Sequence, residues 1–123
     1  VERYVKDCSI QRVQWPKEIG WEELRIKRFK VNEEQNHALD NHVDVTSHLG
    51  GKRMLILMVY LNDNFGGGET VFPLYGDTIK PKKGSLLMFP PMWMYMHRGN
   101  PPLAPGYAKY FLMTYLNYEP IQN

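Results

Sequence analysis

Glycine and proline divide this chain so often that long regular elements have little room. Most of its 10 glycines and 9 prolines lie after residue 50, where they separate short apolar runs. Proline cannot donate a backbone hydrogen bond, and glycine readily adopts turn conformations. Short runs of strand length at close spacing are typical of a β-sandwich or a double-sheet jelly roll. We therefore predict a mainly β fold with little helix.

Three runs define the expected sheet. Met54–Leu61 is continuously apolar, which predicts a central strand covered on both faces. Leu24–Val31 mixes apolar and basic residues and reads as an edge strand whose charges prevent mispairing. Lys109–Tyr118 alternates, so that alternate residues from Lys109 to Tyr115 share one face. Shorter elements are expected as a helix at Val1–Ile10 and strands at Glu69–Phe72, Thr78–Lys80 and Ser85–Phe89.

Two segments read as connections. Asn32–Gly51 is polar and predicts a loop, although His42–Val45 could form a short strand within it. Asn62–Gly68 contains three successive glycines and predicts a long turn.

Size and charge limit the classes of protein that fit. The 123 residues, 43% of them hydrophobic, suit one compact domain spanning residues 1–123. A net charge of +2 is too small to indicate nucleic acid as a partner. No apolar run reaches the ~18 residues that would predict a membrane span, so no membrane association is expected.

The start of the chain and its single cysteine bear on its origin. The first residue is Val1, which leads us to expect a processed or N-terminally truncated chain. Cys8 cannot form an internal disulfide, and no signal peptide opens the sequence. These features favour a cytoplasmic location. The oligomeric state is not predicted.

His42 and Asp44 form the first candidate site. In a strand, residues two apart project to the same side, so an imidazole and a carboxylate can converge on one ion. A second histidine would complete a facial triad of the kind that suits Fe(II) and oxygen chemistry. The alternative is a solvated loop, because such a triplet is common by chance.

His97 is the candidate for the third ligand. It ends an apolar approach, Trp93–Met96, that reads as a strand, and it precedes a turn. A core histidine bonded to a backbone carbonyl is the alternative. His37 and His48 lie in the polar loop and are expected to be exposed.

Lys109 stands at the head of the last strand, on the same face as Phe111 and Met113. An inward lysine is costly unless it is paired, and a ligand carboxylate would supply the partner. Alternatively, Lys109 lies at the strand edge and extends to water.

The order of the motifs resembles one family. His42-x-Asp44 is followed by Tyr60-Leu61-Asn62-Asp63, the Gly67–Pro73 run, and Lys80-Pro81-Lys82-Lys83-Gly84. Phe89, His97-x-Gly99-x-Pro101, Gly106 and Lys109 come next. This series resembles the prolyl 4-hydroxylase branch of the Fe(II)- and 2-oxoglutarate-dependent dioxygenases, over roughly Arg25 to Tyr118. The resemblance implies a double-stranded β-helix, or jelly-roll, core.

The resemblance also implies roles for individual residues. His42, Asp44 and His97 match the three iron ligands, which leaves 2-oxoglutarate two of the open positions and dioxygen the third. Lys109 matches the lysine that pairs with the distal carboxylate of 2-oxoglutarate, and Thr70 a hydroxyl that bonds to it. Arg53 matches an arginine that faces the substrate in some members. Thr70 could instead be a plain strand residue, and Arg53 a solvated charge.

The chain departs from the family pattern at one cosubstrate position. The family often has a tyrosine whose hydroxyl reaches 2-oxoglutarate, and its nearest counterpart here is Phe29. Either Tyr60 or another group replaces that bond, or cosubstrate affinity is lower. The helices that usually support the sheet are also largely missing before Arg25.

The implied activity is hydroxylation of a substrate with release of succinate and carbon dioxide, and ascorbate is a further cofactor that the resemblance suggests. Family analogy favours a prolyl residue in a peptide or protein, held near Arg53, Trp93 and Tyr95. The alternatives are an oxygenase of the same fold acting on nucleic acid or a small molecule, and a non-catalytic jelly roll that binds a metal.

Overall fold

The computed structural model describes residues 1–31 and 39–119. In this part of the chain, short strands predominate and the helices are single turns or little more. The helical elements are α1 (Glu2–Asp7), η1 (Arg12–Gln14) and η3 (Trp93–Tyr95). The strands are β1 (Gly20–Trp21), β2 (Arg25–Lys30), β3 (Arg53–Tyr60), β4 (Thr70–Phe72), β5 (Asp77–Ile79), β6 (Leu86–Phe89), β7 (Arg98–Gly99) and β8 (Ala108–Asn117).

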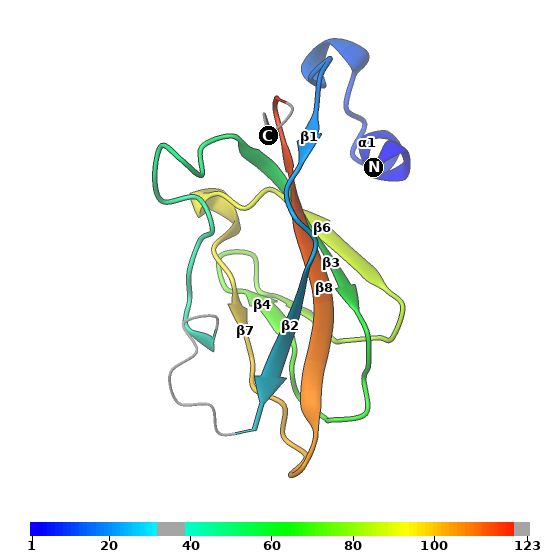
Figure 1. The fold of residues 1–123 in the computed structure, drawn as a ribbon, viewed down its shortest axis with the longest axis vertical. Coiled ribbons are helices and arrows are strands. Elements are labelled where there is room, and N and C mark those ends of the chain that lie inside the picture. The colour runs from blue at the N-terminus through cyan, green and yellow to red at the C-terminus, as the bar shows by residue number, and fades with distance from the viewer. Residues whose placement is uncertain (32–38, 120–123) are drawn as a thin grey trace.

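The larger sheet is built around β8, which runs along most of the length of the molecule (Figure 1). One side of β8 pairs with β3, and β3 pairs in turn with β6. The other side pairs with β2 and, further along, with the short β1. All these pairings are antiparallel. As predicted, β3 is an internal strand, and β2 lies at the edge of the sheet.

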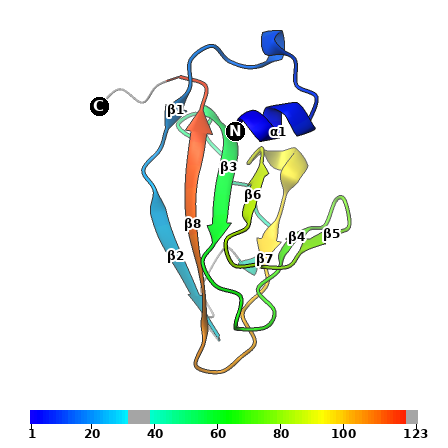
Figure 2. The same ribbon diagram turned by 90° about the vertical axis from the view of Figure 1, so that its right-hand side faces the viewer.

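A smaller sheet of three antiparallel strands, in the order β5-β4-β7, forms the second layer. Figure 2 shows the broad larger sheet with the strands of the smaller one beside it. Two antiparallel sheets of this kind form a jelly roll, which confirms the predicted fold class. Of the helices in the described ranges, none is long and apolar enough to cross a membrane.

The core lies on the inner face of the larger sheet. In β3, Ile56, Met58 and Tyr60 point inward, and their partners in β8 are Tyr115, Met113 and Phe111. Apart from Met113, which is half-buried and packs against them, these residues belong to one buried cluster that also contains Phe29, Phe72 and Phe89. The alternation predicted for β8 from Lys109 to Tyr115 is therefore confirmed.

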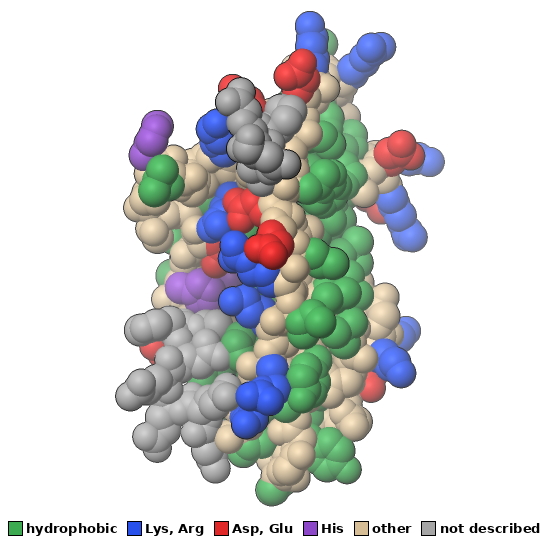
Figure 3. All heavy atoms as spheres, viewed as in Figure 1, with side chains coloured by type: hydrophobic (Ala, Val, Ile, Leu, Met, Phe, Trp, Pro, Cys, Tyr) green, Lys and Arg blue, Asp and Glu red, His purple; other side chains and the backbone are tan. Residues whose placement is uncertain are grey.

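The outer face of β3 corrects the prediction of a strand covered on both sides. Leu57 and Val59 on that face are only half-buried, and Leu86, paired with Val59, is 50% exposed. An antiparallel sheet can leave one face in water. The short α1 covers only one end of this face, near Leu55 (Figure 2). In Figure 3, apolar side chains accordingly run down the right-hand side.

Other differences from the sequence prediction are local. His42–Val45 makes an isolated bridge instead of a strand. The approach to His97 is the single turn η3, not a strand. The two-residue strands β1 and β7 were not predicted, because such short elements have no period to detect. The turn at Gly66–Gly68 is confirmed, and all three glycines have positive φ.

Candidate metal centre and adjoining pocket

His42, Asp44 and His97 come together at one point of the structure. One potential ligand atom from each lies within 4.8 Å of the others. Nε2 of His42 is 3.4 Å from Oδ1 of Asp44, and Nε2 of His97 is 4.0 Å from the same oxygen. His48 is exposed and outside this group, whereas His37 falls outside the described residues.

Backbone hydrogen bonds fix the segments that carry these side chains. The amide of His42 donates to the carbonyl of His97 at 2.8 Å, and the amide of His97 donates back at 3.0 Å. The amides of Asp44 and Val45 both donate to the carbonyl of Pro91, at 3.2 and 3.1 Å. Two segments distant in the sequence are thus held together at the positions where ligands are needed.

The two imidazoles are oriented alike. Nδ1 of His42 lies 2.8 Å from the carbonyl of Asp40, and Nδ1 of His97 lies 3.0 Å from the carbonyl of Tyr95. A carbonyl only accepts, so each Nδ1 carries the proton and each Nε2 offers a lone pair. Metal-binding histidines are commonly oriented by such a bond from the other ring nitrogen.

Charge at the centre favours a bound cation. Burial alone would raise the pKa of Asp44, but the close imidazoles of His42 and His97 outweigh it and lower that pKa. The contact with Asp44 raises the pKa of His42, while burial lowers the pKa of His97. Oδ2 of Asp44 is buried without a hydrogen-bond partner among the described residues. Two imidazoles and one such carboxylate fit Fe(II).

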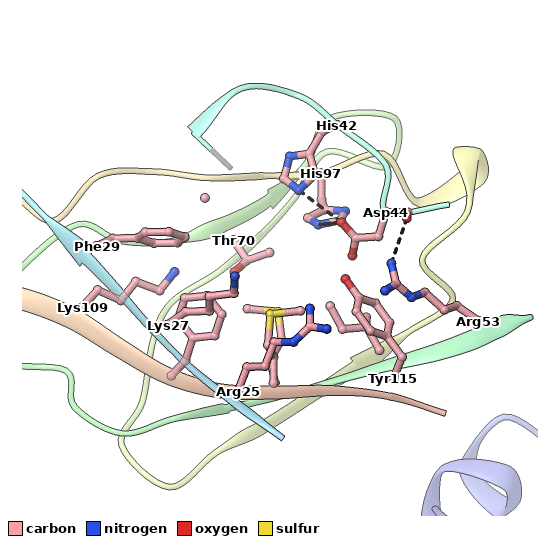
Figure 4. A pocket seen from close by; sticks show the side chains of 15 residues that line it. Arg25, Lys27, Phe29, His42, Asp44, Arg53, Thr70, His97, Lys109 and Tyr115 are labelled. Atoms are coloured by element: carbon pink, nitrogen blue, oxygen red, sulfur yellow. Dashed lines mark hydrogen bonds and ion pairs between the residues drawn. The ribbon is translucent and has the colours of Figure 1, made fainter. Parts of the chain in front are cut away.

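A cavity of about 220 Å³ opens beside these ligands (Figure 4). This volume suits a small organic molecule. Residues from both sheets line the cavity: Arg25, Lys27, Phe29, His42, Asp44, Arg53, Ile56, Met58, Thr70, His97, Gly99, Lys109, Phe111, Met113 and Tyr115. It is apolar along the core strands and polar at its ends.

Lys109 marks one end of the pocket. Its side chain is fully buried, so the alternative in which it extends to water is wrong. Nζ donates to the carbonyl of Gly68 at 2.7 Å and lies 5.3 Å from the ring centres of both Tyr60 and Phe111. Burial lowers the pKa of Lys109 to about 8, against an opposing effect of Glu69. Within the described residues, Lys109 makes no ion pair.

Thr70 and Tyr60 form a hydrogen-bonded pair beside Lys109. The Tyr60 hydroxyl and Oγ1 of Thr70 are 2.8 Å apart, and both residues are buried. Thr70 lines the cavity, but Tyr60 lies behind it. Phe29 also lines the cavity and packs on Phe111 with a centroid distance of 5.3 Å.

Arg53 lies at the opposite end, with its charge already paired. Its guanidinium makes two bonds to Glu22, at 2.6 and 2.8 Å. The guanidinium carbon also lies 4.0 Å from the centre of the Tyr115 ring. The Tyr115 hydroxyl points toward Asp44 (Figure 4), and burial together with that carboxylate raises the pKa of Tyr115. Arg53 thus supports the metal end of the pocket.

Two predicted substrate residues lie elsewhere. Trp93 and Tyr95 do not line the cavity. Tyr95 instead packs against Tyr75, with ring centres 5.5 Å apart, and Trp93 is 71% exposed. Any contact that they make with substrate would therefore occur outside this pocket.

Sequence reasoning missed Arg25, Lys27 and Tyr115 as pocket residues. The signal for Tyr115 was present, because it shares the face of Lys109. The signal for Arg25 and Lys27 was their spacing of two residues from each other and from Phe29. The basic character of the segment concealed it, because charge usually marks a solvated edge.

A jelly roll that brings two histidines and one carboxylate to the end of a small pocket defines a mononuclear metal protein of the facial-triad class. Comparison with known proteins identifies the family. A model of the 2OG-Fe(II) oxygenase superfamily matches residues 26–117, more than half of the chain. This chain belongs to the 2OG-Fe(II) oxygenase superfamily, as its motifs predicted.

Curated relatives are named as prolyl 4-hydroxylases. The chain is 34% identical over 77 residues to a putative prolyl 4-hydroxylase of Acanthamoeba polyphaga mimivirus, covering 58% of this chain and 32% of the relative. It is 31% identical over 96 residues to prolyl 4-hydroxylase 2 of Arabidopsis thaliana, covering 60% of this chain and 32% of the relative. The chain thus spans about a third of the length of these two relatives.

A solved structure shares the fold. The viral collagen prolyl hydroxylase of Paramecium Bursaria Chlorella virus-1, in a complex with 2OG, matches with a TM-score of 0.67 and 23% identity. The match covers 94% of this chain and 68% of the viral one. A second structure of that enzyme gives a TM-score of 0.64 at the same identity.

Proposed function

We propose that this chain is the catalytic part of an Fe(II)- and 2-oxoglutarate-dependent dioxygenase that hydroxylates a peptidyl proline. One observation carries the proposal. A three-ligand metal centre and a fully buried lysine, which pairs with no described carboxylate, line the same small pocket. A structural metal site does not require such a lysine, whereas an oxygenase with a dicarboxylate cosubstrate requires a cation that binds the second carboxylate.

The protein residues divide the work by position. His42, Asp44 and His97 would hold the iron, with Nε2 of each imidazole free to bind. Iron held there together with 2-oxoglutarate would supply oxygen activation, with succinate and carbon dioxide as the expected coproducts. Lys109 would bind the distal carboxylate through a charge-assisted hydrogen bond. The side chains of Phe29, Phe111 and other apolar lining residues would exclude water.

Thr70 would add a neutral hydrogen bond to the same carboxylate. The family tyrosine that would bond to 2-oxoglutarate is replaced here by Phe29, which has no hydroxyl. We propose that the hydrogen-bonded pair of Tyr60 and Thr70 takes over that role. Tyr60 lies behind Thr70 and would orient its hydroxyl without touching the cosubstrate itself.

The prolyl substrate is proposed because the relatives are named as prolyl 4-hydroxylases. Arg53 lines the pocket, but its bonds to Glu22 leave it less free to contact a peptide than the sequence suggested. Trp93 would contact a peptide only where the peptide extends beyond the pocket. We also expect ascorbate to sustain repeated turnover, as the family resemblance suggests.

The test is a turnover assay with Fe(II), 2-oxoglutarate and ascorbate. Succinate and carbon dioxide are quantified first without peptide, and then with a library of proline-containing peptides analysed by mass spectrometry. A gain of one oxygen on proline, absent in His97→Ala and retained in His48→Ala, is expected. Succinate without hydroxylated peptide would refute the prolyl substrate and keep the oxygenase. No succinate from metal-loaded protein would refute the activity.

A further inference from the structure

The side-chain pattern of β2 is inverted with respect to a normal edge strand. Leu24, just before it, and Ile26 within it are 60% and 67% exposed. Arg25 and Lys27 instead line the pocket. The register explains this arrangement, because Arg25 lies opposite Met113 and Lys27 opposite Phe111, and both partners face inward. We call Arg25 and Lys27 the basic rim.

The basic rim adds positive charge that no described residue of the pocket balances. Arg53 is paired with Glu22, and Asp44 belongs to the metal centre. The side chains of Arg25 and Lys27 make no hydrogen bond or ion pair with any described residue. Figure 4 shows both side chains reaching into the cavity, on the side opposite His42 and Asp44. The stretch Leu24–Lys27 turns its apolar residues outward and its cations inward, which is the pattern of an anion-binding surface.

The basic rim lies apart from Lys109, the proposed partner of the cosubstrate carboxylate. Phe29 is the partner of Lys109 in the sheet, so Lys27 and Arg25 lie two and four residues further along β2. At ~3.4 Å per residue these steps are roughly 7 and 14 Å. Arg25 therefore lies toward the end of the pocket near Tyr115, away from the buried lysine. An anion bound there would belong to the substrate.

Edge protection accounts for only part of this charge. Arg28 and Lys30 face the outer side of β2 and already disfavour pairing with another strand. In Figure 3, basic side chains gather down the middle of this face, next to histidine side chains. Protection of an edge does not require that two of the four cations line a pocket.

We propose that Arg25 and Lys27 are specificity-determining residues that bind a substrate carboxylate, so that the chain prefers peptides with an acidic residue beside the reacting proline. The proposal rests on the proposed function and refines it. The planar guanidinium of Arg25 matches a carboxylate through two parallel hydrogen bonds, and Lys27 adds a point charge. A net charge of only +2 favours an acidic peptide over nucleic acid.

The experiment uses three peptides that differ only in the residue next to proline, which is Glu, Gln or Lys. Hydroxylation is followed by mass spectrometry, and kcat/KM is compared for the wild type, Arg25→Gln, Lys27→Gln and the double variant. Arg28→Gln, on the opposite face of the same strand, is the matched control. We expect the wild type and the control to prefer Glu over Gln by at least about tenfold, the effect of one charge-assisted bond.

Each rim variant should lose most of that preference, whereas Arg28→Gln should keep it. An unchanged Glu-to-Gln ratio would overturn the proposal. So would a raised KM for 2-oxoglutarate with the ratio intact, which would assign the rim to the cosubstrate. Aggregation of the variants with unaltered kinetics would reduce the rim to edge protection.

A binding experiment tests this proposal independently of the proposed function. If no peptide is hydroxylated, the binding of the same three peptides, now carrying a fluorescent label, is measured by fluorescence anisotropy with Mn(II)-loaded protein. Tighter binding of the Glu peptide, lost in Arg25→Gln, would uphold the basic rim although the activity had failed. Equal binding of all three peptides, or tighter binding of a labelled oligonucleotide that depends on the rim, would overturn it.

Discussion

The ammonium group of Lys109 donates to the carbonyl of Gly68 at 2.7 Å, inside the pocket that also contains the metal ligands. A buried cation with one neutral acceptor is incompletely satisfied. The surrounding rings of Tyr60, Phe111 and Phe29 add only weak attraction at 5.3 to 5.9 Å. This arrangement leaves donor capacity for a ligand carboxylate.

The first prediction concerns cosubstrate affinity. Lys109→Ala should weaken 2-oxoglutarate binding about 10- to 150-fold, since a hydrogen bond to a charged group is worth roughly 1.5–3 kcal/mol. Thr70→Val should cost less, because its bond is neutral. Titration calorimetry with Mn(II)-loaded protein measures both effects. The exposed Lys17→Ala is the control, and equal affinity in the wild type and Lys109→Ala would remove Lys109 from this role.

The second prediction concerns pH. Because burial lowers the pKa of Lys109 to about 8, the free protein loses this charge as the pH rises above about 8. Binding of 2-oxoglutarate should therefore weaken with increasing pH above that value, and it should be accompanied by proton uptake. Affinity measured from pH 6.5 to 9.5 in two buffers of different ionisation enthalpy tests this. A flat profile in the wild type would contradict it.

The stability of the folded protein should also depend on the Lys109 proton, but it should increase with pH whereas the binding of 2-oxoglutarate weakens. Between pH 8 and about 10.4 the unfolded chain holds the Lys109 proton and the folded chain does not, so folding becomes more favourable as the pH rises. The shift corresponds to roughly 3 kcal/mol at most. The unfolding free energy of the wild type relative to Lys109→Met should increase across this range in urea titrations. A constant difference would show that Lys109 titrates normally.

A further prediction concerns the metal. His42→Ala and His97→Ala should each lose more than about 100-fold in Fe(II) affinity, because even groups that only orient ligands are worth 10- to 100-fold. His48→Ala, on the same loop but exposed, should bind normally. Anaerobic calorimetry measures all three. Normal binding by His97→Ala would exclude this centre.

Another prediction concerns Gly68, whose carbonyl accepts the hydrogen bond from Lys109. Gly68 has a φ of +70°, and a Cβ there would lie 2.4 Å from Cε2 of Phe65. Gly68→Ala should therefore lose about 2–5 kcal/mol of stability, from backbone strain plus overlap. Gly84 also has positive φ but open space, so Gly84→Ala should lose only about 1–2 kcal/mol. Chemical denaturation compares them, and equal losses would show that Phe65 yields without cost.

The sequence predicted the main strands and the family because β8 alternates clearly and the motifs occur in a fixed order. It did not decide where Lys109 points, because a lysine at a strand end can extend to water or turn inward, and only the packed sheet settles this. It also misread the approach to His97, where apolar residues form a turn. β2 was the hardest case. Its basic residues indicated solvent, while the pairing with β8 directs two of them into the pocket.

Because reciprocal backbone bonds join His42 and His97, we expect iron loading to be a late event in assembly. These residues lie far apart in the chain. Strands β3 to β6 lie between them in the sequence, and β8 follows His97. Local hairpins such as β4–β5 can form before the two segments meet, since short loops close first. Metal uptake therefore reports closure of the whole sandwich. In a refolding experiment, the absorbance of bound Co(II) should develop after the far-ultraviolet signal of the sheets.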